Sequence, residues 1–207
     1  MPATIQNDAY TPSQVSAVTG LPLPAVHKAI EYKLIRPKLI REGHSVHRLL
    51  SRSQAVFLRM EAKGLKVLPL AERRQVARAI EQDSGIDAMC ISGENVILIQ
   101  CKAARKEVEA GLRRLAVATR MVKSDPQIMR GAPVYKGTRI PVHAIADMLL
   151  QGATVEEILE GYPALTREKV ELASMYVKAF PRRGRPVARP WARRPPRRVS
   201  RRCLASG

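Results

Sequence analysis

The sequence is short of aromatic side chains and has no long apolar run. Phe, Trp and Tyr make up 4% of the 207 residues, whereas apolar residues as a whole reach 45%. Aliphatic side chains must therefore build the core, which favours helical packing. No run of about 18 apolar residues occurs, and residues 1–10 lack the basic and then apolar order of a signal peptide. We therefore expect a cytoplasmic protein with no membrane span.

Groups that bind metals or react are scarce as well. The three cysteines form no CxxC pair and have no histidine at ligand spacing: Cys90, Cys101 and Cys203. The four histidines have no carboxylate or cysteine partner at ligand or catalytic spacing: His27, His44, His47 and His143. The chain also lacks a Ser-His-Asp order, a phosphate-cradling glycine loop and a clustered acidic set. We expect no catalysis, no metal and no cofactor.

A disulfide is not expected either. Two apolar runs between residues 86 and 101 predict a β-hairpin, and a turn at Gly93-Glu94 would place Cys90 opposite Ile97. Cys101 would then lie about 13 Å from Cys90 along the strands, at ~3.4 Å per residue, which exceeds the ~7 Å that a disulfide allows between Cα atoms. Free thiols in a reducing cytosol are the expected state.

Acidic residues are outnumbered two to one, with 36 Lys and Arg against 18 Asp and Glu, for a net charge of +18. The excess is uneven. Residues 1–60 hold eight basic and three acidic side chains, whereas residues 122–180 hold seven of each. Residues 181–207 hold ten Arg and no acidic residue. Such a balance predicts a polyanionic or strongly acidic partner.

The N-terminal part predicts two short helices at a tight turn. Thr11 and Gln14 can form a capping box for a helix over residues 10–18, and Gly20 ends that helix. Apolar residues at helical spacing predict a second helix over residues 24–33. The pair has the size and spacing of a helix-turn-helix.

A basic hairpin and a third helix follow. Residues 34–41 and 44–49 read as two strands joined at Glu42-Gly43. Ser51 or Ser53 can cap the helix that reaches Lys63. Two helices followed by a basic hairpin is the order of a winged helix-turn-helix.

This segment resembles the N-terminal portion of the MerR family. The matching parts are Tyr10-Thr11-Pro12-Ser13-Gln14-Val15, Gly20 and Leu34-Ile35-Arg36-Pro37. The chain lacks that family's long dimerising coiled coil and its Cys-rich effector loop, so metal or drug sensing is not implied. The resemblance implies a DNA-binding domain over residues 1–63.

In such a domain, a recognition helix enters the major groove and the wing holds phosphates. The residues predicted to contact DNA are basic or histidine side chains of the second helix and the hairpin: His27, Lys28, Arg41, His44, His47 and Arg48. The alternative is a solvated basic face on a structural helix pair.

Residues 64–122 read as an α/β connector. A helix over 69–82 precedes the β-hairpin, and a long helix over 102–122 follows it. The long helix would join, orient or dimerise the flanking parts. Because winged repressors usually read paired half-sites, we expect a homodimer, with helices 102–122 and 166–180 as candidate seams.

Residues 123–180 predict a second helical unit. Two short extended pieces around Lys136-Gly137 precede a helix from Pro141 to about Gln151. Thr154 opens a second helix with a capping box, and Thr166 caps a third. Three helices with tight turns suggest a homeodomain-like unit.

The start of this unit carries a distinctive motif, Gly131-x-Pro133-Val134-x-x-Gly137-Thr138-Arg139-Ile140-Pro141-Val142. With the downstream Gly152, Glu156-Glu157-Ile158-Leu159, Tyr162-Pro163 and Leu165-Thr166, it resembles a bacterial family first catalogued as a domain of unknown function. Members of that family are mostly interpreted as VapB-like antitoxins, encoded beside a PIN-like ribonuclease toxin. The resemblance spans about residues 124–180.

The motif residues are assigned either to toxin binding or to a structural role: Gly131, Pro133, Gly137, Thr138, Arg139 and Pro141. Alternation along the extended piece puts Arg139 on the side opposite Thr138 and Ile140. Arg139 could therefore contact a partner, or pair with a helix end or carboxylate and lock the fold. Because the unit is neutral overall, dimerisation or toxin contact suits it better than DNA binding.

The Arg- and Pro-rich residues 181–207 predict a disordered tail, since such a chain cannot form a core. PIN-like ribonucleases, as the resemblance implies, hold divalent metal with clustered carboxylates. An Arg guanidinium can pair with such carboxylates, and the candidates for this arm are Arg182, Arg183 and Arg185. The alternative is a tail that binds any polyanion.

The sequence therefore predicts a mostly α protein with small β elements, organised as a winged helix-turn-helix, a connector and a three-helix unit. The expected function is that of a type II antitoxin, which neutralises a PIN-like ribonuclease and represses its own operon by binding operator DNA. A stand-alone MerR-like transcription regulator is one alternative. A nucleoid- or RNA-binding structural protein driven by the tail is another.

Overall fold

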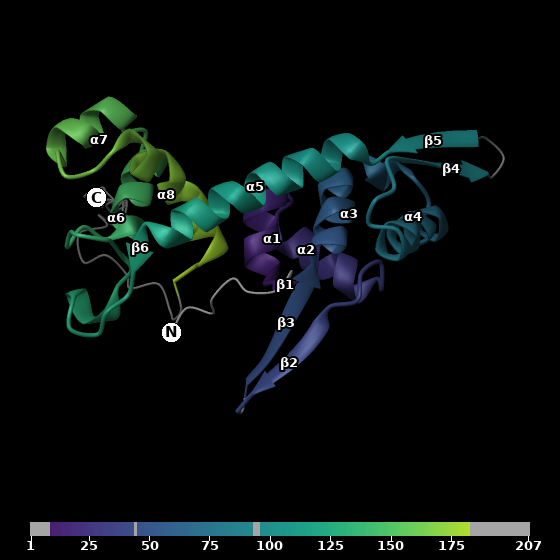
Figure 1. The fold of residues 1–207 in the computed structure, drawn as a ribbon, viewed down its shortest axis with the longest axis horizontal. Coiled ribbons are helices and arrows are strands. Elements are labelled where there is room, and N and C mark those ends of the chain that lie inside the picture. Colours follow the sequence, from purple (N-terminus) through teal and green to yellow (C-terminus); the bar gives the residue numbers. More distant parts are fainter. Residues whose placement is uncertain (1–8, 44, 93–95, 183–207) are drawn as a thin grey trace, which may run out of the picture.

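The computed structural model describes residues 9–43, 45–92 and 96–182 (Figure 1). In these residues the chain is mostly helical with three small antiparallel sheets. The helices are α1 (Pro12–Thr19), α2 (Leu23–Glu31), α3 (Arg52–Ala62), α4 (Leu70–Gln82), α5 (Lys102–Arg120), α6 (Val142–Leu150), α7 (Val155–Gly161) and α8 (Arg167–Ala179). The strands are β1 (Ala9–Tyr10), β2 (Lys38–Glu42), β3 (Ser45–Ser51), β4 (Ala88–Ser92), β5 (Val96–Gln100), β6 (Val122–Lys123) and β7 (Val134–Tyr135).

The helix caps confirm what the local sequence predicts. The Thr11 and Gln14 capping box starts α1, and Gly20 ends that helix with a φ of 74°. Ser51, rather than Ser53, caps α3 and forms a capping box with Gln54. These side chains satisfy backbone N–H groups that a helix leaves unpaired at its first turn, so they fix where α1 and α3 begin.

The first sheet is a hairpin that projects from the helices. Strands β2 and β3 pair from Lys38 with Leu49 to Glu42 with Ser45, and β1 pairs with the C-terminal end of β3. The base of the hairpin is therefore anchored, because Leu50 is fully buried beside β1. Figure 1 shows the rest of β2 and β3 extending away from α1–α3.

The second hairpin lies at the other end of the same unit. Strands β4 and β5 pair with Cys90 opposite Leu98, so the predicted pairing of Cys90 with Ile97 is wrong by one residue. The loop between the strands is one residue longer than a two-residue turn, and this sets the register. Both described cysteines, Cys90 and Cys101, are free thiols as predicted, and Cys101 is buried.

Helix α5 connects the two helical parts of the molecule (Figure 1). Gly111 allows it to approach α1 closely, since a Cβ at Gly111 would lie 2.8 Å from Val18 Cγ1. Helix α8 lies against α1, α5 and α6. Part of the apolar surface of α5 and α8 is thus covered within one chain, and the dimer seams that the sequence suggests at 102–122 and 166–180 stay a prediction.

The C-terminal unit consists of β6, β7 and α6–α8. Of the two extended pieces predicted around Lys136-Gly137, only the first forms a strand, β7. Strand β7 pairs with β6, and the following segment contributes a single bridge between Val134 and Pro141. The strand that completes the pair lies directly after α5, so β6 attaches the unit to the long helix.

Two separate apolar clusters form the core. One joins α1–α4, β4, β5 and the first half of α5, and the other joins the end of α5 to α6–α8. Aliphatic residues dominate both clusters, as the low aromatic content predicts, and Tyr135 and Phe57 are the largest fully buried side chains. Among the described residues, no helix is both long and apolar enough to cross a membrane.

Candidate nucleic-acid interface and partner surface

Helix α2 presents a polar face outward. Val26 and Ala29 are buried under α2, while Lys28 is exposed and His27 is half-buried. The helix begins after Pro22, whose ring suits a position just before the first turn. Of the two predicted contact residues on α2, Lys28 is therefore the one that reaches solvent fully.

The projecting hairpin has two different faces. The pairing places Leu39 opposite Arg48 and Arg41 opposite Val46, so these four side chains share one face. All four are exposed, with Leu39 at 61% and Val46 at 57%. Two guanidinium groups beside two exposed aliphatic side chains make an amphipathic surface that suits a nucleic-acid backbone and groove wall.

His47 lies on the other face of the hairpin. Its Nε2 atom is 3.8 Å from the Glu42 carboxylate, and its side chain is half-buried. The predicted DNA contacts include His47 together with Arg41 and Arg48, but strand alternation places His47 on the opposite face of the hairpin. His44, another predicted contact residue, lies outside the described residues.

A basic pocket beside α2 was not predicted. It has a volume of about 300 Å³ and lies between the end of α2 and α4, lined by Lys33, Leu34, Arg36, Arg74, Arg78 and Glu81. Arg74 Nη2 donates to the Tyr32 carbonyl at 3.0 Å, which links α4 to the end of α2. Four basic side chains and one acidic side chain, Glu81, thus line one concavity, and Arg36 lies just before the hairpin. The pocket brings together residues about 40 positions apart, so no local motif could reveal it.

A hydrogen bond and two ion pairs connect α1, α3 and α5. Arg59 donates from Nη1 to the Thr19 carbonyl at 2.6 Å and from Nε to Glu107 at 2.7 Å. Lys63 also pairs with Glu107. These cations hold the pKa of Glu107 below its usual range, with the hydrogen bond from Lys63 as the main cause. The network ties the end of α1, and with it the turn into α2, to α3 and α5.

In the C-terminal unit, most residues of the Gly-Thr-Arg-Ile-Pro motif hold a backbone turn in shape. Thr138 N donates to the Tyr135 carbonyl at 3.0 Å across a turn in which Gly137 has a φ of 79°. The Thr138 hydroxyl closes the same turn by donating to Tyr135 O at 2.9 Å and accepting from Ile140 N. Pro141 is the N-cap of α6. Gly137 is the third residue of the turn from Tyr135 to Thr138, and type II turns need a left-handed residue at that position, which glycine adopts without strain.

The remaining motif residues behave in a similar way, except for Arg139. Gly131 has a φ of 80°, and Pro133 accepts a hydrogen bond from Val142 N at 3.0 Å. Arg139 is exposed and makes no hydrogen bond or ion pair with any residue of the described ranges, so it does not lock the fold. The motif thus holds a turn in shape and presents one free cation at its tip.

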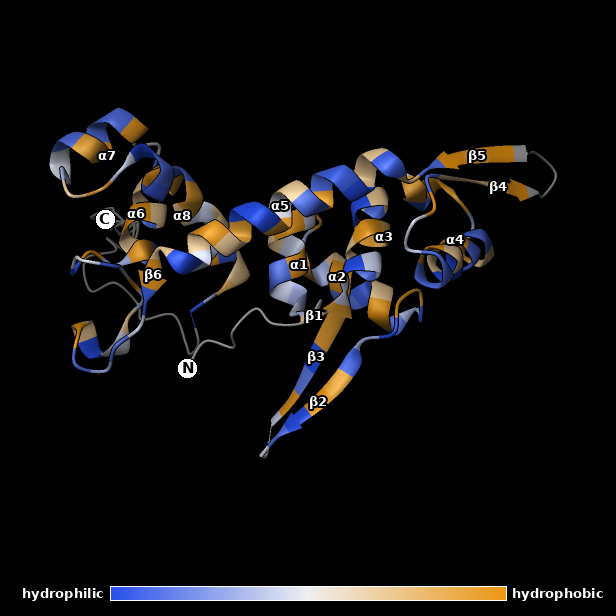
Figure 2. Cartoon of the chain, viewed as in Figure 1, coloured by the Kyte–Doolittle hydropathy of each residue, from blue (hydrophilic) through white to orange (hydrophobic). Residues whose placement is uncertain are grey.

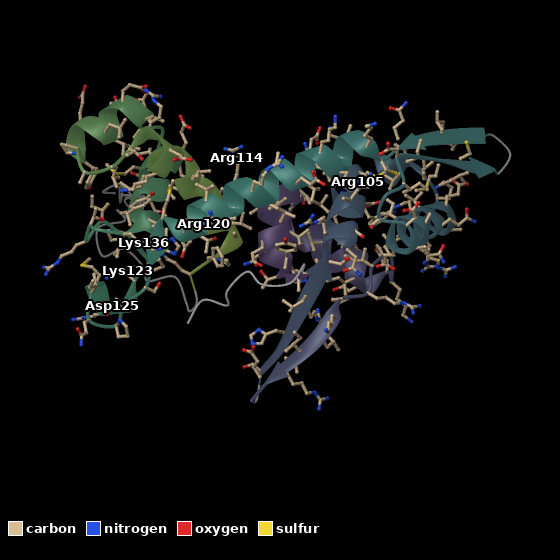
Figure 3. The ribbon with its side chains drawn as sticks, in the orientation of Figure 1. Arg105, Arg114, Arg120, Lys123, Asp125 and Lys136 are labelled. Carbon is tan, nitrogen blue, oxygen red and sulfur yellow. The ribbon has the colours of Figure 1, made fainter. Side chains whose placement is uncertain are left out.

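Charge within this neutral unit is segregated. Residues 122–140 hold four basic and one acidic side chain, whereas residues 141–180 hold three basic and six acidic. Figure 3 shows Lys123 and Lys136 near Arg120 at the end of α5, with Asp125 beside Lys123. Lys123 pairs with Asp125 at 3.6 Å. We call Arg120, Lys123, Lys136 and Arg139, all exposed, the basic edge.

A buried histidine lies in the same unit. His143 on α6 is 6% exposed, and its Nδ1 atom has no hydrogen-bond partner in the structure. Burial, together with the Arg182 guanidinium, lowers its pKa. Arg182 itself pairs with Asp147 at 3.4 Å, so this predicted arm residue lies against α6. The other two predicted arm residues, Arg183 and Arg185, lie outside the described ranges.

Comparison with known proteins gives one family match and one similar protein. Residues 122–177 match a family described as Protein of unknown function (DUF433). Over 71 residues the chain is 48% identical to the uncharacterized protein y4eO of Sinorhizobium fredii (strain NBRC 101917 / NGR234), covering 34% of this chain and 32% of that protein. The chain therefore spans about a third of the length of this curated relative. No solved structure matches it.

Proposed function

We propose that the protein is a DNA-binding antitoxin, whose N-terminal unit binds operator DNA and whose C-terminal unit binds a PIN-like ribonuclease. The observation that best supports DNA binding is the projecting hairpin, which exposes Arg41 and Arg48 on one face. No acidic side chain lies on that face of the paired strands. Repression of its own operon would follow from occupation of the promoter.

In this proposal, the N-terminal unit works as a winged helix-turn-helix. Helix α2 enters the major groove with Lys28 toward base edges, and the β2–β3 hairpin is the wing. The pocket formed by Lys33, Arg36, Arg74 and Arg78 adds phosphate contacts beside the end of α2. Glu107 and Arg59 support the arrangement because they fix the α1 end from which α2 starts.

The C-terminal unit, in the same proposal, is a three-helix antitoxin unit that binds the toxin through its basic edge. A ribonuclease that holds metal with clustered carboxylates offers an acidic cleft, and guanidinium groups pair with carboxylates in bidentate geometry. Arg139 extends from a turn that hydrogen bonds hold in place, so little backbone freedom is lost on binding. The similarity of residues 122–177 to an uncharacterised family is compatible with this role.

The DNA-binding part is tested with two double variants of equal charge change. Arg41→Ala with Arg48→Ala should flatten the slope of log affinity against log salt by about 1.8, since each lost phosphate contact removes about 0.9. Lys136→Ala with Arg139→Ala is the matched control and should leave DNA affinity unchanged. Equal DNA affinity for the hairpin variant and the wild type would refute the assignment.

The same two variants test the toxin-binding part, with the test variant and the control exchanged. The Lys136→Ala, Arg139→Ala variant should lose inhibition of the ribonuclease encoded by the neighbouring gene, while the Arg41→Ala, Arg48→Ala variant should keep it. Deletion of residues 181–207 tests the arm separately. If the truncated protein still inhibits RNA cleavage at equal stoichiometry, the tail is dispensable. If the neighbouring gene encodes no binding partner while operator binding is intact, a stand-alone regulator is the better description.

A further inference from the structure

The β4–β5 hairpin is a two-stranded sheet with both edges unpaired among the described residues. It projects from the far end of α5 (Figure 1). Isolated two-stranded hairpins are marginal in water, and here only one face is covered. Ile91 and Ile99 are buried in the core cluster that contains α4, whereas Cys90 and Leu98 are exposed on the other face, Leu98 at 60%.

The two strands carry no charged residue, although charged residues make up 26% of the chain. Figure 2 shows β5 as hydrophobic over most of its length. Natural proteins usually protect open strand edges with Lys, Pro or bulges, and an uncharged, β-branched edge without such protection promotes self-association. Residues 96–100, Val-Ile-Leu-Ile-Gln, have none of these protections.

We propose that the β5 edge pairs with the β5 edge of a second copy of this chain, which gives a continuous four-stranded antiparallel sheet. The partner is a second copy because of charge. Two chains of net charge +18 repel each other, and an uncharged edge is a place where identical surfaces can meet without placing like charges opposite each other. A two-fold axis makes such an interface self-complementary.

The register follows from the hydrogen bonds of the hairpin. Cys101 N donates to the Asp87 carbonyl at 2.8 Å, so hydrogen-bonded pairs alternate inward from that position. The backbone groups of Val96, Leu98 and Gln100 therefore point outward. A two-fold axis at Leu98 would pair Val96 with Gln100 of the partner subunit and bring the two Leu98 side chains together on the exposed face. Strand β4 would occupy the outer positions of the new sheet.

Light scattering of the full chain tests the proposal without DNA or toxin. At tens of micromolar the wild type should have twice the 23.0 kDa mass of one chain. Leu98→Lys should give a single-chain mass, because two ammonium groups would meet at the axis. Leu98 is already largely exposed, so a native circular dichroism spectrum is expected. Val67→Lys, at a residue 86% exposed outside this hairpin, is the matched control and should stay dimeric.

Cysteine cross-linking identifies the edge. In a Cys90→Ser, Cys203→Ser background, Leu98→Cys should form an intermolecular disulfide on mild oxidation, since hydrogen-bonded antiparallel pairs have Cα atoms about 5.5 Å apart. Cross-linking of wild-type Cys90 to itself would instead indicate pairing through β4 and would overturn the β5 assignment. A monomeric wild type, or a Leu98→Lys variant that stays dimeric, would overturn the proposal.

Discussion

The N-terminal and C-terminal units treat buried polar groups in opposite ways. In the N-terminal unit, Glu61 on α3 is 3% exposed and accepts hydrogen bonds from Arg73 Nε at 2.8 Å and Nη2 at 2.6 Å. In the C-terminal unit, His143 is almost as buried but its Nδ1 atom has no partner. The first unit therefore contains a complete ion pair, and the second contains an imidazole for which burial favours the neutral form.

This difference separates two kinds of sensitivity. A satisfied buried pair makes the first unit vulnerable to loss of either partner. An unpaired imidazole makes the second unit vulnerable to acid, although no contact is removed. Both units contain a helix that starts with a capping box, α1 in the first and α7 in the second, so helix starts alone would not distinguish them. Four substitutions test this contrast and the junction between the units.

Glu61→Ala should have the largest effect on stability. Removal of the carboxylate leaves the Arg73 guanidinium, whose side chain is only 16% exposed, without a counter-charge. Breaking a buried pair on one side costs about 3–5 kcal/mol, which chemical denaturation would measure. Glu156→Ala is the matched control, since Glu156 pairs with Arg167 at the surface and its loss should change stability little. Equal effects of the two variants would contradict the contrast.

Gly111→Ala should destabilise the junction between α1 and α5. The added Cβ would lie 2.8 Å from Val18 Cγ1 and 3.2 Å from Val18 O. Overpacking costs about 1–3 kcal/mol, and the better helix propensity of alanine offsets about 1 kcal/mol of that. Val18→Ala in the same chain should recover part of the loss. Additive effects in this double-mutant cycle would show that the contact is not the cause.

The stability of the chain should fall as the pH drops below about 6.5, the ordinary pKa of histidine. Because the pKa of His143 is lowered in the folded state, the unfolded state takes up its proton first. Each unit of lowering corresponds to about 1.4 kcal/mol. His143→Leu should reduce this fall between pH 7 and pH 5.5 in thermal denaturation. His47→Gln, on the hairpin, should leave it in place.

Lys33→Gly should have the smallest effect and the opposite sign. Lys33 ends α2 with a φ of 56°, a conformation that glycine adopts without strain. We expect stabilisation of less than about 1 kcal/mol, because glycine also gains entropy in the unfolded chain. The same substitution removes one cation from the pocket beside α2, so DNA affinity should fall while stability rises. If DNA affinity and stability both fell, the loss of affinity would be explained by the fold, and Lys33 would have no separate role in binding DNA.

The sequence predicts the local features of this fold well. Helix starts at Thr11 and Thr154 were correct because a capping box is contained within four residues, and Ser51 was one of the two caps predicted for α3. The register of β4 with β5 was wrong by one residue, since it depends on loop length rather than on composition. The packing of α8 against α1 was not predictable, because residues more than 140 positions apart meet there.

The candidate site shows the same limit. Arg41 and Arg48 share an exposed face, as a basic wing requires, but strand alternation turns His47 to the other side. The pocket beside α2 was missed because Arg74 and Arg78 come from a helix that sequence reasoning assigned to the connector. The basic edge was missed because residues 122–180 have a net charge of zero. That sum combines a basic segment, residues 122–140, with an acidic one, residues 141–180.

The length of α5 has a consequence for the valency of an assembly. Its 19 residues form one unbroken helix, about 28 Å long at 1.5 Å per residue, with the β5 edge at one end and the basic edge at the other. In a dimer joined through β5, the two rods would keep the basic edges on the outer ends, well away from the two-fold axis. Each copy could then bind its own partner protein at the basic edge without steric competition. The complex would contain equal numbers of this chain and of the partner protein.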